Sequence, residues 1–233
     1  MTKRFLPFAA ASALALAAAG VAHAQDAAPS PTLTFNVAGA TNYEFRGVSQ
    51  TDNKAALQGG ADAGYGLFYA GVWASNVKFA GDKADVEIDT YAGVKPTFGS
   101  VAFDFGVIHY GYLGEAVGVQ DDYWEFKAAA SKTFDKATIG VAAYYSPDFF
   151  AKTDNAIYYE VNGAFAVTPK ISVSAALGRQ DVSYAGDYTT WNVGAAYAIT
   201  DHASIDVRYW DTGSHHFGDI YSSRIVATLK GTF

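Results

Sequence analysis

The sequence predicts an all-β fold: a closed antiparallel transmembrane β-barrel of about twelve strands, preceded by a cleaved signal peptide. Three observations predict it. Apolar and polar residues alternate with a period of two from Leu33 onward, connections between the expected strands alternate between short and long, and the final strand ends the chain on Phe233. Alternation of this kind is typical of strands that have one apolar face and one polar face.

The first 24 residues have the pattern of a secretory signal peptide. Lys3 and Arg4 precede an apolar run, and Ala22-His23-Ala24 forms a small-residue cleavage site, so we expect cleavage after Ala24. A membrane anchor fits less well, because the run is short for a helix of about 20 residues. Residues 25–31 are expected to be a flexible lead, and residues 32–233 to form one outer-membrane barrel.

The clearest strand begins the barrel. Its odd positions are mostly apolar or aromatic: Leu33, Phe35, Val37, Gly39, Thr41, Tyr43 and Phe45. Its even positions are small or polar: Thr34, Asn36, Ala38, Ala40, Asn42, Glu44 and Arg46. We expect the odd face to contact lipid and the even face to point into the barrel.

The same reading along the chain gives an even number of strands, as single-chain bacterial barrels require. The predicted strands are 32–48, 55–64, 67–77, 85–95, 101–112, 122–132, 137–146, 156–167, 170–180, 187–199, 203–211 and 220–233. Connections after even-numbered strands are short, as at Tyr65-Gly66 and Thr168-Pro169, whereas those after odd-numbered strands are mostly longer and more polar. Short periplasmic turns and longer outer loops are the outer-membrane pattern.

The last strand supports this interpretation. Ile225, Leu229 and Phe233 share one face, and Arg224 and Lys230 lie on the other. A charge facing lipid at mid-membrane costs about 2–4 kcal/mol, so the charged face must point inward. A terminal aromatic in register with the apolar face is expected to be the signal that the barrel assembly machinery reads.

Composition excludes several classes of protein. There are 16 Tyr, 16 Phe and 23 Gly but no Cys, so the chain has no disulfide and no thiolate metal site. The expected mature chain keeps 14 of the 16 basic residues and all 23 acidic residues, a formal charge of −9. A balance this acidic argues against nucleic acid as a partner.

Several strings resemble the proteobacterial family called TorF, whose members are regarded as porins. They are NYEFRGVSQTDN at 42–53, ALQG at 56–59, FYAGVWASN at 68–76, DTYAG at 89–93 and YYSPDF at 144–149. The resemblance covers most of the mature chain and is most specific over residues 42–76. It implies an outer-membrane barrel of porin type, without a known substrate or catalytic residue.

The inward face is predicted to be charged. The predicted lumen-facing residues are Glu44, Arg46, Asp62, Glu87, Asp89, Lys95, Asp104, Glu125, Lys127, Glu160, Asp206, Arg208, Arg224 and Lys230. The predicted outward aromatic and apolar residues include Phe35, Tyr43, Ile88, Phe103, Phe105, Trp124, Phe126, Tyr159, Phe165, Trp191, Tyr197 and Tyr209. Both signs of charge line the lumen, which predicts weak ion selectivity.

Two functions fit this interior. One is a narrow aqueous pore for small solutes, and the other is a closed structural barrel filled with ion pairs, because twelve strands fall between filled small barrels and open large ones. Small inward residues such as Gly106 and Gly194 favour open space, but they equally leave room for large side chains from the facing wall.

An enzyme is a distant alternative. His215 and His216 share the last outer loop with Asp211 and Asp219, so a metal site or an Asp–His dyad is conceivable there, although a solvated loop is the simpler interpretation. His109 is interpreted as an interfacial residue. Asp121-Asp122 could bind cations that bridge lipopolysaccharide, and Phe149-Phe150 either are exposed or fold into the mouth.

The prediction is therefore a non-enzymatic barrel without a cofactor or metal. Its expected partners are outer-membrane lipid, lipopolysaccharide, the assembly machinery and small solutes.

Overall fold

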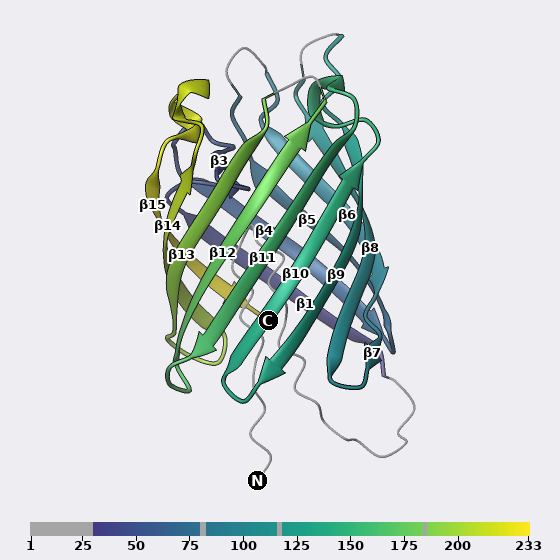
Figure 1. Ribbon diagram of the computed structural model, residues 1–233, viewed down its shortest axis with the longest axis vertical. Helices are drawn as coiled ribbons and strands as arrows, with labels where there is room; N and C mark the ends of the chain where they lie inside the picture. The colour runs from purple at the N-terminus through teal and green to yellow at the C-terminus, as the bar shows by residue number, and fades with distance from the viewer. Residues whose placement is uncertain (1–29, 80–82, 116–117, 184–185) are drawn as a thin grey trace.

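The computed structural model describes residues 30–79, 83–115, 118–183 and 186–233 (Figure 1). The predicted signal peptide at residues 1–24 and most of the predicted lead lie outside the described residues. Among the described residues, no helix has the length and apolar character needed to cross a bilayer.

Twelve long antiparallel strands form one closed sheet, which confirms the predicted fold class. They are β1 (Thr32–Ala40), β4 (Ala56–Tyr65), β5 (Phe68–Asn76), β6 (Val86–Val94), β8 (Val101–Leu113), β9 (Tyr123–Phe134), β10 (Ala137–Ser146), β11 (Ala156–Ala166), β12 (Ile171–Val182), β13 (Tyr188–Ala198), β14 (Ala203–Thr212) and β15 (Arg224–Thr232). The two-residue strand β7 (Thr97–Phe98) extends one turn of the sheet by pairing with β8.

The sheet closes between the first and last strands. Asn36 pairs with Thr232 and Ala40 with Thr228 across the β1–β15 seam. Beyond this ladder, the backbone N–H groups of Phe35 and Phe233 each donate to the carbonyl of the other residue at 2.9 Å. Closure pairs the backbone groups of both strands, as a hydrocarbon environment requires.

Side chains alternate strictly between the two faces of this sheet. The outward face is apolar and uncovered: Phe126, Val141 and Leu229 each expose more than half of their surface. The inward face carries most of the charges, and the ion pair between Arg179 and Asp181 lies on the outward face near the outer end of β12. The barrel thus has a polar interior and a mainly apolar exterior. This arrangement suits a protein whose outer wall is covered by lipid.

Short turns gather at one end of the barrel and long connections at the other, as Figure 1 shows. β4 and β5 are joined by residues 66–67, with Gly66 at φ 61°, and β9 and β10 by residues 135–136. The long connections include residues 41–55 and 213–223. By analogy with the expected topology we refer to the long-loop end as outer and the short-turn end as periplasmic.

Two predicted strands were too long. The first ends at Ala40 rather than at residue 48, and the last begins at Arg224, after a short 3-10 helix at Asp219–Tyr221. The first error has a clear cause: residues 42–51 form a small hairpin, and a hairpin continues the alternation of period two.

Candidate functional site

The connection between β1 and β4 folds into the barrel from the outer end. Its strands β2 (Glu44–Phe45) and β3 (Val48–Ser49) pair around a tight turn, and we call residues 42–51 the inward hairpin. Arg46 and Gly47 have φ values of 51° and 81°, the left-handed geometry of a two-residue hairpin turn. A Cβ atom on Gly47 would lie 2.2 Å from Oγ1 of Thr190 on β13, so only glycine fits.

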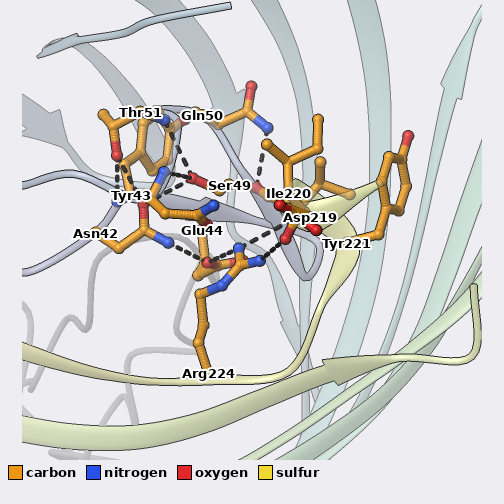
Figure 2. A network of polar contacts seen from close by, with 12 residues as sticks. Asn42, Tyr43, Glu44, Ser49, Gln50, Thr51, Asp219, Ile220, Tyr221 and Arg224 are labelled. Carbon is orange, nitrogen blue, oxygen red and sulfur yellow. Dashed lines mark hydrogen bonds and ion pairs between the residues drawn. The ribbon is translucent and has the colours of Figure 1, made fainter. Parts of the chain in front are cut away.

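Polar contacts within the inward hairpin fix its shape (Figure 2). The hydroxyls of Ser49 and Thr51 lie 2.8 Å and 2.7 Å from Oδ1 of Asn42. The backbone N–H of Gln50 donates to the carbonyl of Tyr43 at 2.8 Å, and the N–H of Tyr43 donates to Thr51 Oγ1 at 3.2 Å. The hairpin is therefore ordered by its own side chains as well as by the barrel.

Arg46, at the tip of the hairpin, crosses the lumen to the opposite wall. Its guanidinium donates to both carboxylate oxygens of Glu125 on β9, at 2.8 and 2.7 Å, and to Oε1 of Gln180 on β12 at 2.8 Å. The guanidinium also lies over the rings of Tyr158 and Tyr144, at 4.3 and 4.9 Å from their centroids. Only 5% of Arg46 is exposed, so the ion pair is dry.

Glu44 makes the second ion pair of the hairpin. Arg224 on β15 donates to Oε1 of Glu44 at 2.6 Å and to the carbonyls of Ile220 and Asp219 at 2.9 and 2.6 Å, as Figure 2 shows. Burial raises the pKa of the Glu44 carboxyl to about 7, and the Arg224 guanidinium opposes that shift. The second oxygen of Glu44 is buried without a hydrogen-bond partner among the described residues.

A third set of contacts joins the hairpin to strands β5, β6 and β8. The hydroxyl of Tyr43 donates to Glu87 on β6 at 2.8 Å, and its ring packs edge-on against Trp73 on β5. Phe45 packs edge-on against Tyr110 on β8. The inward hairpin thus contacts strands on several sides and occupies the outer half of the lumen.

The periplasmic half is lined differently, by tyrosines that lie along the wall. The Tyr91 ring covers Gly71 on the neighbouring strand, where a Cβ would be 2.5 Å from it, and its hydroxyl donates to Asp62 at 2.6 Å. Tyr69 covers Gly93 in the same way and donates to Asp104 at 2.8 Å. Glycine beside each ring keeps the ring against the wall and out of the axis.

Solvent exposure of the predicted lumen residues follows this division. Five residues of the outer half are buried: Glu44, Arg46, Glu87, Asp89 and Glu125. Among the residues of the periplasmic half, Asp62, Asp104, Glu160, Asp206, Arg208 and Lys230 are partly exposed, Lys95 is exposed and Lys127 is buried. Arg224 is partly exposed at the outer end.

Most charges of the periplasmic half have partners. Lys127 forms an ion pair with Asp104 at 2.6 Å, and Arg208 forms one with Asp206 at 3.0 Å. Lys95 lies over the Tyr69 ring. The structure thus places acids and bases next to one another around this half.

Sequence reasoning placed several residues wrongly or missed them. Tyr43 was expected to face lipid, and Phe45 shared that outward face, but both lie inside because the strand ends before them. Glu44 and Arg46 lie in the lumen on the hairpin rather than on a wall strand. The sequence analysis did not identify three partners of Arg46: Gln180, Tyr144 and Tyr158. The available signal was that each occupies an inward-facing position of its alternating strand.

The other candidate positions have ordinary environments. His215 Nε2 lies 2.6 Å from Oδ1 of Asp211 at the exposed outer rim, and His109 packs against Trp124 on the outward face. Phe149 and Phe150 fold over the mouth, against Tyr123 and Tyr112 respectively.

No group of three or more His, Asp or Glu in the described ranges could hold a metal ion.

The closed barrel, its apolar outer wall and its charged lumen define the class of the protein: an outer-membrane β-barrel with a porin-type fold. A family model described as "Bacterial protein of unknown function (Gcw_chp)" matches residues 24–233. The chain therefore belongs to the Gcw_chp family.

Solved porin structures share this fold at low sequence identity. The KdgM porin is 8% identical, with a TM-score of 0.63 over 86% of this chain and 99% of that chain. The NanC porin is 8% identical, with a TM-score of 0.58 over 85% and 98% of the two chains. The COG4313 outer membrane channel from Pseudomonas putida F1 is 10% identical, with a TM-score of 0.51 over 89% and 96%. Among curated proteins, none matches the sequence.

Proposed function

We propose that the protein is an outer-membrane channel for passive diffusion of small solutes or ions, whose opening is controlled by the inward hairpin. The observation that carries the proposal is the division of the lumen. The periplasmic half is lined by charged, partly exposed side chains, whereas the outer half is occupied by a hairpin held largely through side chains. Similar folds in the KdgM and NanC porins support a transport function.

A closed structural barrel is the alternative, and the buried ion pair between Arg46 and Glu125 favours it. A hairpin docked permanently would leave no continuous aqueous path. The two functions make opposite predictions for conductance, and no step in either requires an enzyme activity, a metal or a cofactor.

Planar-bilayer recordings of refolded protein separate the two. We expect single-channel steps from the wild type and larger steps from a variant in which residues 43–50 are replaced by a short Gly/Ser turn. The matched control replaces the exposed residues His215 and His216 of the last outer loop by Ser, which leaves the carbonyls of Asp219 and Ile220 in place, and it should conduct like the wild type. If neither the wild type nor the shortened hairpin variant conducts at any voltage, the barrel is structural and the channel proposal is wrong.

The remaining predictions belong to the same proposal. We infer cleavage of a signal peptide after Ala24 and delivery to the outer membrane, with lipid and lipopolysaccharide around the barrel. Phe233 would serve as the assembly signal, and the lumen-facing charges named above would line the path. Relationship to the TorF family rests on the strings between residues 42 and 149.

A further inference from the structure

The partners of Arg46 form a compact site on the barrel wall. Tyr144, Tyr158 and Gln180 are direct cross-strand neighbours on β10, β11 and β12, because Tyr144 pairs with Tyr158 and Tyr158 with Gln180. Glu125 projects from the adjacent strand β9. All four side chains project from barrel strands, so none of them belongs to the hairpin.

The wall also orients these groups independently of Arg46. The hydroxyl of Tyr110 on β8 donates to Oε2 of Glu125 at 3.0 Å, and the amide nitrogen of Gln180 lies 3.4 Å from the carbonyl of Ile157. Gln180 therefore presents its oxygen, an acceptor, to the lumen. With the hairpin docked, Glu125 and Gln180 are each 1% exposed, so Arg46 binds them out of contact with water.

The geometry suits a guanidinium group in particular. Two parallel N–H groups meet the two oxygens of Glu125, a third meets Gln180, and the planar cation lies over two aromatic rings. A planar fork of donors makes bidentate contact with a carboxylate and stacks on aromatic faces, whereas an ammonium group acts as a point charge. The site is thus more selective than a carboxylate alone.

The charge of the wall favours a cation once the hairpin leaves. Glu87, Asp89 and Glu125 all project from wall strands, whereas Arg46 and Glu44 belong to the hairpin. One oxygen of Asp89 is buried without a hydrogen-bond partner among the described residues. Undocking removes Arg46 from this half and leaves two cations on the nearby wall. Arg224 lies at the outer edge, and Lys127, the cross-strand neighbour of Tyr144, is neutralised by its ion pair with Asp104.

From these observations we propose that the wall groups Glu125, Gln180, Tyr144 and Tyr158 form a binding site for solutes that carry a guanidinium group. Arg46 occupies this site as an internal ligand while the hairpin is docked. This proposal rests on the channel function above, because it names the class of solute that competes with the hairpin. A guanidinium solute that replaces Arg46 would at once bind the wall and favour the open hairpin.

The test uses detergent-solubilised, refolded protein and two small probes at equal ionic strength, methylguanidinium chloride and methylammonium chloride. In the Arg46→Ala variant, calorimetry should show saturable binding of methylguanidinium, tighter than methylammonium by at least about tenfold, or roughly 1.4 kcal/mol. Adding Glu125→Gln to that variant should abolish the binding. The wild type should bind far more weakly, because its own Arg46 competes.

If the Arg46→Ala variant folds poorly, the proposal can still be tested by its refolding yield. Methylguanidinium should then raise the refolding yield, measured from the heat-dependent shift of the barrel on gels, and methylammonium should not. Arg46→Gln provides a second variant with the guanidinium removed. The proposal is overturned if methylguanidinium neither binds nor rescues either variant, or if its effect persists without the Glu125 carboxylate.

Failure of this inference is distinguishable from failure of the channel proposal. Binding is measured in detergent without a membrane, and conductance is measured without the probe. If the barrel conducts but the Arg46→Ala variant does not bind methylguanidinium, only the binding-site proposal is contradicted. A barrel that binds methylguanidinium but never conducts contradicts the channel function, and the wall site would then serve only to hold the hairpin.

Discussion

Arg46 and Glu125 form an ion pair that is buried from water. For such a pair, the stability gained from the intact pair is much smaller than the stability lost when one partner is removed. Both charges lose hydration on burial, so the intact pair adds little, but removal of one partner leaves the other charge buried alone. The exposed pair between Lys54 and Asp52 has no such penalty, since water screens both groups.

Glu125→Gln should therefore destabilise the barrel strongly. We expect a loss of about 3–5 kcal/mol in the free energy of unfolding, measured by urea titration in lipid vesicles, because the Arg46 charge stays buried. The control Asp52→Asn should change the free energy of unfolding by less than about 1 kcal/mol. Equal effects of the two substitutions would show that Arg46 is hydrated in the membrane-inserted protein.

The pH dependence of the hairpin follows from Glu44. Its pKa rises from an ordinary 4.5 to about 7 when the hairpin is docked, so the docked state binds the proton more tightly. The contribution of this proton to docking is fully present below pH 4.5 and is lost as the pH rises through about 7. In the proposed channel, the fraction of time spent in the open state should thus increase over this range.

Single-channel recordings in a pH series test this directly. Glu44→Gln should remove the change between pH 4.5 and 7, because the amide does not titrate. Glu87, Asp89 and Glu125 also line this half, so the comparison with the variant, rather than the wild-type profile alone, is decisive. Identical profiles for both proteins would exclude Glu44 as the titrating group.

At the scale of elements, packing of tyrosine on glycine holds the Tyr91 and Tyr69 rings against the wall of the periplasmic half. Gly71→Ala places a methyl group against the Tyr91 ring, which must move into the lumen and lose its bond to Asp62. We expect a loss of about 1–3 kcal/mol in the free energy of unfolding, together with lower conductance. The matched control is Gly39→Ala, where nothing lies within 4 Å of the added Cβ, and it should change neither quantity. Equal loss in both variants would contradict the role of Tyr91.

The hairpin also shows where sequence reasoning fails for an element. Period two predicts the strand correctly through Ala40, yet it cannot separate one long strand from a strand followed by a hairpin. The Arg46-Gly47 pair was a local signal for a turn, because a two-residue hairpin needs positive φ at both positions. Tyr43 and Phe45 lie inside because the chain leaves the barrel wall after Ala40, before either residue.

At the scale of the whole molecule, three features were predictable because a bilayer requires them of a barrel. They are the number of strands, the face of each strand that points outward, and the closure of the sheet. Lipid requires paired backbone, an apolar outer face and spans of limited length, all of which leave a sequence pattern. The path of the first outer loop leaves no such pattern. It depends on Glu125, 79 residues from Arg46, and on Arg224, 180 residues from Glu44, and no local rule identifies those partners.

The division of the lumen predicts a difference in labelling between its two ends. Because the chain has no cysteine, single Ser→Cys substitutions report local access. Ser131→Cys, partly exposed in the periplasmic half of β9, should react quickly with a small charged methanethiosulfonate. Ser146→Cys, fully buried at the outer end of β10, should react many times more slowly. Similar rates at both positions would show that the hairpin does not exclude water.

The bond between Glu44 and Arg224 has a consequence for biogenesis. Glu44 emerges early in synthesis, but its partner lies on the final strand, so the hairpin obtains this anchor only after the C-terminal strand has joined β1. A chain that lacks β15 should hold the hairpin loosely and expose it to proteases. Resistance of residues 42–51 to cleavage would then report that β15 has been made and has paired with β1 to close the barrel.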